Sequence, residues 1–126
     1  MNRCFSNILS KNVSATATFY EELLGMRRHF DSNWFVILAH DNIEGLELGI
    51  LQRNHEIVPE AVQAAPAGVM ITFVVDDCDA VHERALKQGA LVVETPVDMP
   101  YGQRRMLLKD PDGTVVDISA PTAPIR

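Results

Sequence analysis

The chain has 126 residues, of which 47% are hydrophobic and 22% charged, and its formal net charge is -6. This length predicts one domain with a real core, and the acidic balance argues against nucleic acid as a partner, since nucleic-acid binding needs clustered Lys and Arg. No apolar run approaches the roughly 20 residues of a membrane span, and the first residues lack the apolar stretch of a signal peptide. The two cysteines, Cys4 and Cys78, stand far apart, so we expect reduced thiols in a cytoplasmic protein. Because no segment is apolar enough to span a membrane, we expect no membrane partner.

The first half of the chain predicts a strand, a helix and a hairpin. A short strand is expected over 4–9, followed by a helix that Asn12 or Ser14 caps and that Gly25 ends. Strands are expected over 34–38 and 46–51, joined by a polar turn at 40–42. Residues 52–68 are rich in Pro, Ala and charge, which predicts a linker with room for one helical turn.

The second half predicts the same order of elements. A strand over 70–75 leads to a helix that Asp76 or Asp77 caps and that Gly89 stops. Residues 91–93 are strand-like, and a loop containing Pro96 and Pro100 follows. The last two strands are expected over 104–109 and 114–119, around a tight turn formed by Asp110-Pro111-Asp112-Gly113.

The two halves therefore look like a duplication. An offset of 65 residues places Phe5 on Met70 and Asn12 on Asp77, and Gly25 falls within one residue of Gly89. We expect module one over about 3–53, a linker over about 54–67 and module two over about 68–120. Because the strands alternate, helices should cover one sheet face and leave the other open. The alternation assigns these residues to the open face: Glu47, Gly49, Met70, Thr72, Val74, Val115, Asp117 and Ser119.

Three motifs carry a resemblance to a known family. They are Asn12-Val13-Ser14 with the stretch 19–26, the stretch 73–81, and Asp110-Pro111-Asp112-Gly113 with Asp117 beyond. Together they resemble the vicinal oxygen chelate superfamily of glyoxalases, bleomycin resistance proteins and extradiol dioxygenases. The resemblance implies an α+β fold in which two βαβββ modules form a cup-shaped mixed sheet with helices on its outer face. It also implies a homodimer, with the pairing of modules within or between subunits left open.

The same resemblance implies where a divalent metal would be held. Metal-dependent members carry one ligand in the first strand and one in the last strand of each module, usually His and Glu. Those four positions are Phe5, Glu47, Met70 and Asp117 here. A phenyl ring and a thioether do not bind such an ion, and two carboxylates fall short of the usual three or more ligands. We therefore expect no metal and no cofactor.

The two remaining carboxylates, Glu47 and Asp117, are the strongest candidates for chemistry. A carboxylate facing a partly apolar cavity is expected to have a raised pKa, which suits a general base or a binder of cations. Alternatively, each carboxylate is paired with an arginine or solvated at the rim.

Other side chains are candidates for ligand contact. Arg104 and Arg105 are adjacent on one strand and so point to opposite faces. The run Tyr101-Gly102-Gln103-Arg104 resembles a motif that is common in the family, and this favours Arg104 as the arginine in the cavity. That arginine grips a ligand anion or pairs with a carboxylate. One of Trp34 and Phe35 should face the opening, as a ligand wall or as core. The expected ligand-binding set is Phe5, Asn7, Trp34, Glu47, Met70, Thr72, Tyr101, Arg104 and Asp117.

Two functions are compatible with these residues. The first is a small-molecule-binding protein without the usual metal site, similar to the bleomycin-resistance branch. The alternative is a metal-independent or atypical lyase, isomerase or dioxygenase-like enzyme that acts on a small oxygenated metabolite. The missing histidine pair favours binding, and the sequence leaves open whether any reaction is catalysed.

Overall fold

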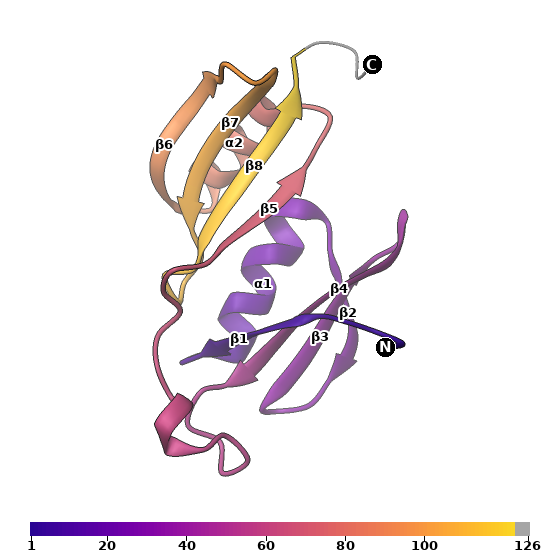
Figure 1. Cartoon of the computed structure of the whole chain (residues 1–126), viewed down its shortest axis with the longest axis vertical. Coiled ribbons are helices and arrows are strands. Elements are labelled where there is room, and N and C mark those ends of the chain that lie inside the picture. Colours follow the sequence, from indigo (N-terminus) through magenta and orange to yellow (C-terminus); the bar gives the residue numbers. More distant parts are fainter. Residues whose placement is uncertain (123–126) are drawn as a thin grey trace. The chain divides into compact units, whose positions relative to one another are not determined.

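A computed structural model describes residues 1–122 of the chain. It divides into two compact units, Met1–Pro66 and Ala67–Arg126, called module one and module two below. In each module one helix packs against a mixed sheet of four strands (Figure 1). The α+β class and the two βαβββ modules are therefore as predicted.

Module one has one parallel and two antiparallel strand pairs. Its sheet order is β1-β4-β3-β2, and β1 runs parallel to β4. A 3-10 turn, η1, falls in the segment that was predicted to be a linker with one helical turn. The elements are β1 (Ser6–Ser10), α1 (Val13–Leu24), β2 (Arg27–Asp31), β3 (Phe35–His40), β4 (Ile43–Gln52) and η1 (Glu60–Val62).

Module two repeats this arrangement. Its sheet order is β5-β8-β7-β6, with β5 parallel to β8 and the other pairs antiparallel. The elements are β5 (Met70–Val74), α2 (Cys78–Lys87), β6 (Leu91–Asp98), β7 (Gln103–Lys109) and β8 (Val115–Pro121).

The helix caps confirm the predicted duplication. The side chain of Asn12 accepts a hydrogen bond of 3.1 Å from the backbone N–H of Ala15 at the start of α1. Asp77 accepts a bond of the same length from Ala80 at the start of α2. Gly25 then ends α1 in the left-handed conformation, with φ of 68°. The same chemistry thus starts both helices at the offset read from the sequence.

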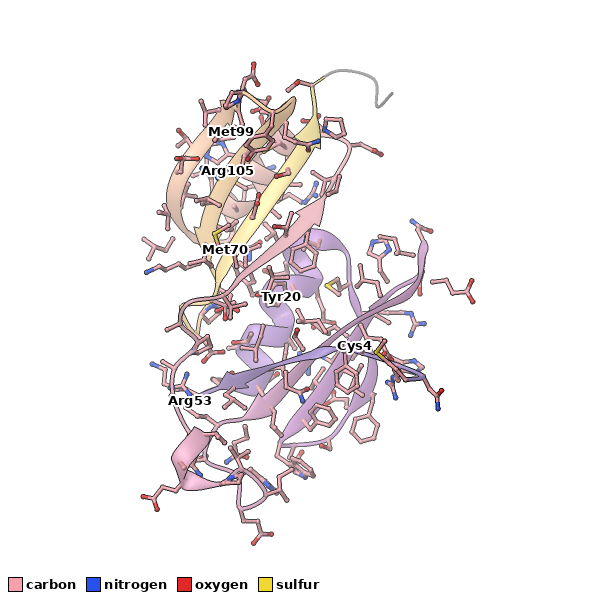
Figure 2. All side chains as sticks on the ribbon, viewed as in Figure 1. Cys4, Tyr20, Arg53, Met70, Met99 and Arg105 are labelled. Atoms are coloured by element: carbon pink, nitrogen blue, oxygen red, sulfur yellow. The ribbon has the colours of Figure 1, made fainter. Side chains whose placement is uncertain are left out.

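Alternation along the strands separates the core from the open face, as predicted. Leu48 and Ile50 of β4, and Val116 and Ile118 of β8, are buried on the helix-facing side. Tyr20 of α1 has no exposed surface and lies within the core of module one (Figure 2). The opposite face of each sheet carries no helix of its own module.

Two strands differ from the sequence prediction. The strand β2 was not predicted, because it lies at the edge of its sheet and four of its five residues are exposed. The strand β6 extends through Pro96, where a loop was expected. Proline is tolerated there because β6 is an edge strand whose register with β7 is irregular between Glu94 and Val97.

Neither helix within residues 1–122 is long and apolar enough to cross a membrane.

Candidate functional site

The register of module one brings several predicted site residues onto one open face. Asn7 of β1 lies beside Gly49 of β4, and Gly49 lies beside Ile37 of β3. Glu47, two residues before Gly49, shares its face. The open face of module one therefore combines a carboxylate with an amide and an apolar strand.

Arg3, which precedes β1, is the cation that Glu47 contacts. Its Nε donates a hydrogen bond of 2.7 Å to Glu47 Oε2, and its Nη2 donates to Oε1. The Arg3 guanidinium carbon also lies 4.9 Å from the centroid of the Phe5 ring. One guanidinium thus forms a two-pronged ion pair and a cation–π contact.

This ion pair reverses the expected pKa shift of Glu47. The hydrogen bonds from Arg3 lower the pKa of the Glu47 carboxyl below its ordinary 4.5, and the smaller effect of desolvation, which raises it, does not offset them. The expectation of a raised pKa is therefore wrong, and the alternative of pairing with an arginine describes the residue. Because its pKa is lowered, Glu47 is ionised at neutral pH.

Replacing Arg3 with alanine is expected to raise the pKa of Glu47 toward its ordinary value, because the stabilising donors are lost. When the pKa of a carboxyl group is lower in the folded than in the unfolded protein, its ionisation stabilises the folded state. This stabilisation is complete at pH values above the unfolded-state pKa and is lost as the pH falls through the lower, folded-state pKa. The wild-type and Arg3→Ala proteins should therefore differ in stability above pH 4.5 and converge below it. Side-chain NMR titration of Glu47 measures the shift, and an identical titration in both proteins would contradict it.

Gly49 is required for the close approach of Asn7 and Phe5. A Cβ placed on Gly49 would lie 2.0 Å from Asn7 Oδ1 and 3.2 Å from Cε2 of Phe5. Only a residue without a side chain lets both groups lie across β4 at this point.

The Gly49→Ala variant is expected to lose about 1 kcal/mol of stability, because the added methyl group forces Asn7 from its rotamer and moves the Phe5 ring. The cost is modest because the clashing atoms belong to side chains that can move. Urea unfolding measures the loss, and the NMR signals of the Asn7 side-chain amide should shift strongly. Unchanged Asn7 signals would show that the close approach is not present in solution.

Aromatic rings continue along the open face of module one. Phe30 of β2 lies beside Ile37, and its ring centroid is 5.9 Å from that of Phe35. Trp34, immediately before β3, stacks at 4.0 Å on His55 and at 6.0 Å on Phe35. Trp34 therefore lies at the opposite end of β3 from Ala39, which pairs with Glu47.

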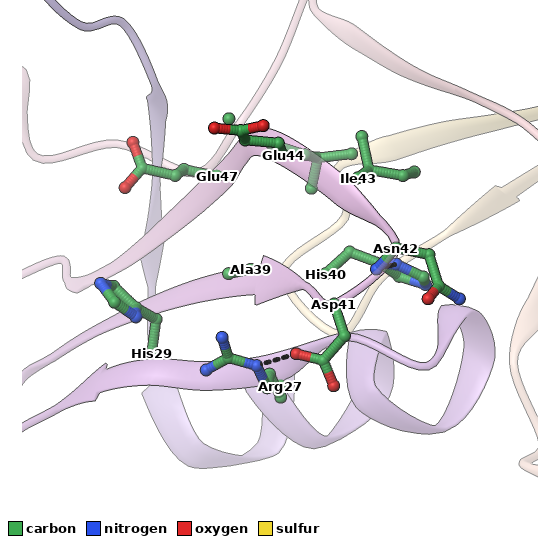
Figure 3. Close-up of a pocket in the computed structure, with 11 residues that line it drawn as sticks. Arg27, His29, Ala39, His40, Asp41, Asn42, Ile43, Glu44 and Glu47 are labelled. Carbon is green, nitrogen blue, oxygen red and sulfur yellow. Dashed lines mark hydrogen bonds and ion pairs between the residues drawn. The ribbon is translucent and has the colours of Figure 1, made fainter.

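A groove of about 480 Å³ opens at the β3–β4 hairpin. Figure 3 shows the carboxylates of Glu44 and Glu47 on β4, His29 on β2, and the ion pair between Arg27 and Asp41. The lining includes three carboxylates against one arginine, so the groove is acidic.

In module two the structure brings Thr72 and Asp117 together. Asp117 of β8 is buried and lies beside Thr72 of β5 and Leu107 of β7. Its Oδ2 accepts a hydrogen bond of 3.0 Å from Thr72, and its Oδ1 accepts one of 2.7 Å from Ser119. Met70 lies on the same face, two residues before Thr72, and is half-exposed. The carboxylate of Asp117 is thus held by two hydroxyl groups.

Arg105, and not Arg104, lies on the open face of module two. Arg105 pairs in register with Ser119 and donates a hydrogen bond of 2.9 Å to Glu94; Figure 2 labels it on β7. Arg104 shares the helix-facing side with the buried Met106 and contacts Asp79, in the first turn of α2. The preference for Arg104 in the cavity is therefore wrong. Tyr101 is exposed in the turn between β6 and β7.

The residues at the four family metal positions do not fit a divalent ion. Phe5 and Met70 supply no suitable donor atom. Both oxygens of Glu47 accept from Arg3, and both oxygens of Asp117 accept from hydroxyl groups. Within residues 1–122, no group of three or more His, Cys, Asp or Glu side chains could hold a metal ion.

Arg3 is the site residue that sequence reasoning missed. The signal was present, because Arg3 alternates with Phe5 and Asn7 and so falls on their face if the strand period is extended toward the N-terminus. The predicted strand begins at residue 4, so the predicted open face does not include Arg3.

Comparisons with known proteins identify the family to which these paired βαβββ modules belong. The family model described as the Glyoxalase/Bleomycin resistance protein/Dioxygenase superfamily matches residues 3–118. The chain belongs to this superfamily.

The individual relatives share only about a quarter or less of their residues with this chain. The chain is 26% identical over 117 residues to a protein named putative glyoxylase CFP32 from Mycobacterium bovis, covering 93% of this chain but 43% of the relative, less than half its length. It is also 26% identical to the uncharacterized protein YwbC of Bacillus subtilis, covering 89% of this chain and 91% of that one. A crystal structure of a glyoxalase-related enzyme from Fulvimarina pelagi superposes with a TM-score of 0.82 at 21% identity, covering 100% of this chain and 94% of that one, which shows a shared fold.

Proposed function

We propose that the chain binds a small organic molecule against the open face of module one, without the divalent metal of metal-dependent relatives. The observation that carries this proposal is the composition of that face. Three phenyl rings, Phe5, Phe30 and Phe35, accompany one ionised carboxylate, Glu47, and Phe30 is 48% exposed. Apolar walls with a few placed polar groups are typical of small-molecule sites.

Binding is favoured over catalysis by the state of the two carboxylates. A general base works best with a pKa near the working pH. The pKa of Glu47 is shifted downward by Arg3, away from that range. Asp117 already accepts from Thr72 and Ser119. We therefore favour a binding or sequestering protein, like the bleomycin-resistance branch, over a metal-independent lyase, isomerase or dioxygenase-like enzyme.

A homodimer belongs to the same proposal. The open face of module two exposes Met70, Val74 and Val97 by 51%, 65% and 43%, and a second copy of the chain would cover these apolar side chains. Sedimentation velocity should give a dimer that Val74→Asp weakens, and a monomer at all concentrations would contradict it. We also propose a cytoplasmic location, which the two unpaired thiols, Cys4 and Cys78, support.

The single tryptophan offers a direct test of binding. Trp34 adjoins Phe35 on the open face, so a ligand seated there should change its fluorescence. Aromatic fragments of positive, negative and zero charge are titrated into protein treated with a chelator. We expect at least one class to bind and change the signal, with Trp34→Phe losing the signal but keeping calorimetric binding. Binding that appears only after zinc, nickel, manganese or iron is added would contradict the proposal.

A further inference from the structure

The contact between Arg3 and Glu47 has the geometry of a bound ligand. The guanidinium meets both carboxylate oxygens of Glu47 and lies over the face of Phe5. Proteins recognise guanidinium and ammonium groups with two elements. A carboxylate pairs with the positive charge, and the face of an aromatic ring packs against the cation.

The two partners are unequally fixed in place. Glu47 lies within β4, between two strands, and its side chain is 16% exposed. Arg3 precedes the first residue of β1, and its side chain is 53% exposed. An ion pair with one exposed partner contributes little to stability. The position of the Glu47 carboxylate is therefore fixed by the sheet, whereas Arg3 can move away from Glu47 at a small cost in free energy.

The surroundings of Glu47 favour a cation over an anion or a neutral group. Glu47 lines the acidic groove at the β3–β4 hairpin together with Glu44 and Asp41 (Figure 3). The arginine in that lining, Arg27, is paired with Asp41. A ligand whose cationic group sits on Glu47 therefore meets further negative charge beside it.

We propose that Glu47 and Phe5 form a subsite for a guanidinium, amidinium or ammonium group of an organic ligand, and that Arg3 occupies this subsite until the ligand displaces it. This inference rests on the proposed function, because it names the class of ligand that the open face of module one takes. Arg3 then acts as an internal competitor, which lowers the apparent affinity by the fraction of time it occupies the subsite.

Benzamidine and benzamide provide a matched pair of probes, because they share a ring and differ in the charged amidinium group. Calorimetry measures their binding to the wild-type, Arg3→Ala and Glu47→Gln proteins, since Trp34 lies at the other end of β3 from the residue that pairs with Glu47. We expect Arg3→Ala to bind benzamidine about three- to sixfold more tightly, since an exposed ion pair is weak but must be broken by the ligand. Glu47→Gln should bind it about tenfold more weakly or worse.

The control variants separate this effect from a change in net charge. Glu83→Gln removes the same charge from module two, and Lys87→Ala removes one cation from the surface of α2, so neither should change the affinity. Thermal unfolding confirms that each variant is folded. Benzamide should bind weakly to all variants, and high salt should weaken only benzamidine.

Three results would overturn the inference. They are equal affinities of wild type and Arg3→Ala, undiminished binding to Glu47→Gln, and no binding of benzamidine to any variant. A neutral or anionic fragment that still changes Trp34 fluorescence would leave the proposed function standing while this inference fails. Failure of every fragment in that screen would remove the proposed function as well.

Discussion

Replacing Asp110 with alanine is expected to destabilise the protein by about 2–4 kcal/mol, because each buried amide that loses its acceptor costs about 1–3 kcal/mol. Asp110 lies in the turn between β7 and β8 and is only 5% exposed. Its Oδ1 accepts from the backbone N–H groups of Asp112 at 2.9 Å and Thr114 at 3.0 Å. The alanine variant leaves both amides without this carboxylate in a buried turn.

Asp110→Asn is the matched control. Asparagine keeps an oxygen at the position that both amides contact and loses only the charge, so we expect a loss of about 1 kcal/mol. Chemical denaturation of the three proteins measures the difference. Equal losses in both variants would show that the turn depends on charge and not on the two hydrogen bonds.

Replacing Leu38 with alanine is expected to cost about 2–5 kcal/mol, because the deletion leaves a cavity in a packed core. Leu38 has no exposed surface and lies on the helix-facing side of β3, beside Leu48 of β4. This change tests the assignment of core and open faces in module one.

Leu46→Ala makes the same chemical change on the helix-facing side of the neighbouring strand β4. Leu46, however, is partly exposed near the hairpin. Its loss should be well below that of Leu38→Ala, since less apolar surface returns to water and no closed cavity forms. Urea unfolding of both variants gives the comparison. A larger loss for Leu46→Ala would contradict the burial of Leu38 in the packed core of module one.

Much of the fold could be predicted because its signals are local. Asn12 and Asp77 are strong helix caps, and their spacing in the sequence indicated the duplication. The alternation in β4 and β8 identified the core face of each. The strands β2 and β6 were missed or shortened because edge strands need no apolar face and tolerate residues such as Pro96.

The candidate site was harder to predict because it depends on contacts between distant residues. Alternation placed Asn7, Glu47 and Gly49 on one face, as the register shows. The sign of the pKa shift at Glu47 depends on Arg3, 44 residues away in the chain, which no local pattern connects to it. The choice between Arg104 and Arg105 depends on the register of β7 with β8, which a short motif did not supply.

The most direct test of a binding site without a divalent metal is the metal content of the purified protein after incubation with zinc, nickel, manganese and iron, followed by dialysis. We predict retention far below one ion per chain, unchanged in a Glu47→Ala and Asp117→Ala double variant, because both carboxylates are held by other side chains. Near-stoichiometric retention that the double variant loses would contradict the metal-free binding site and favour a metal-dependent enzyme.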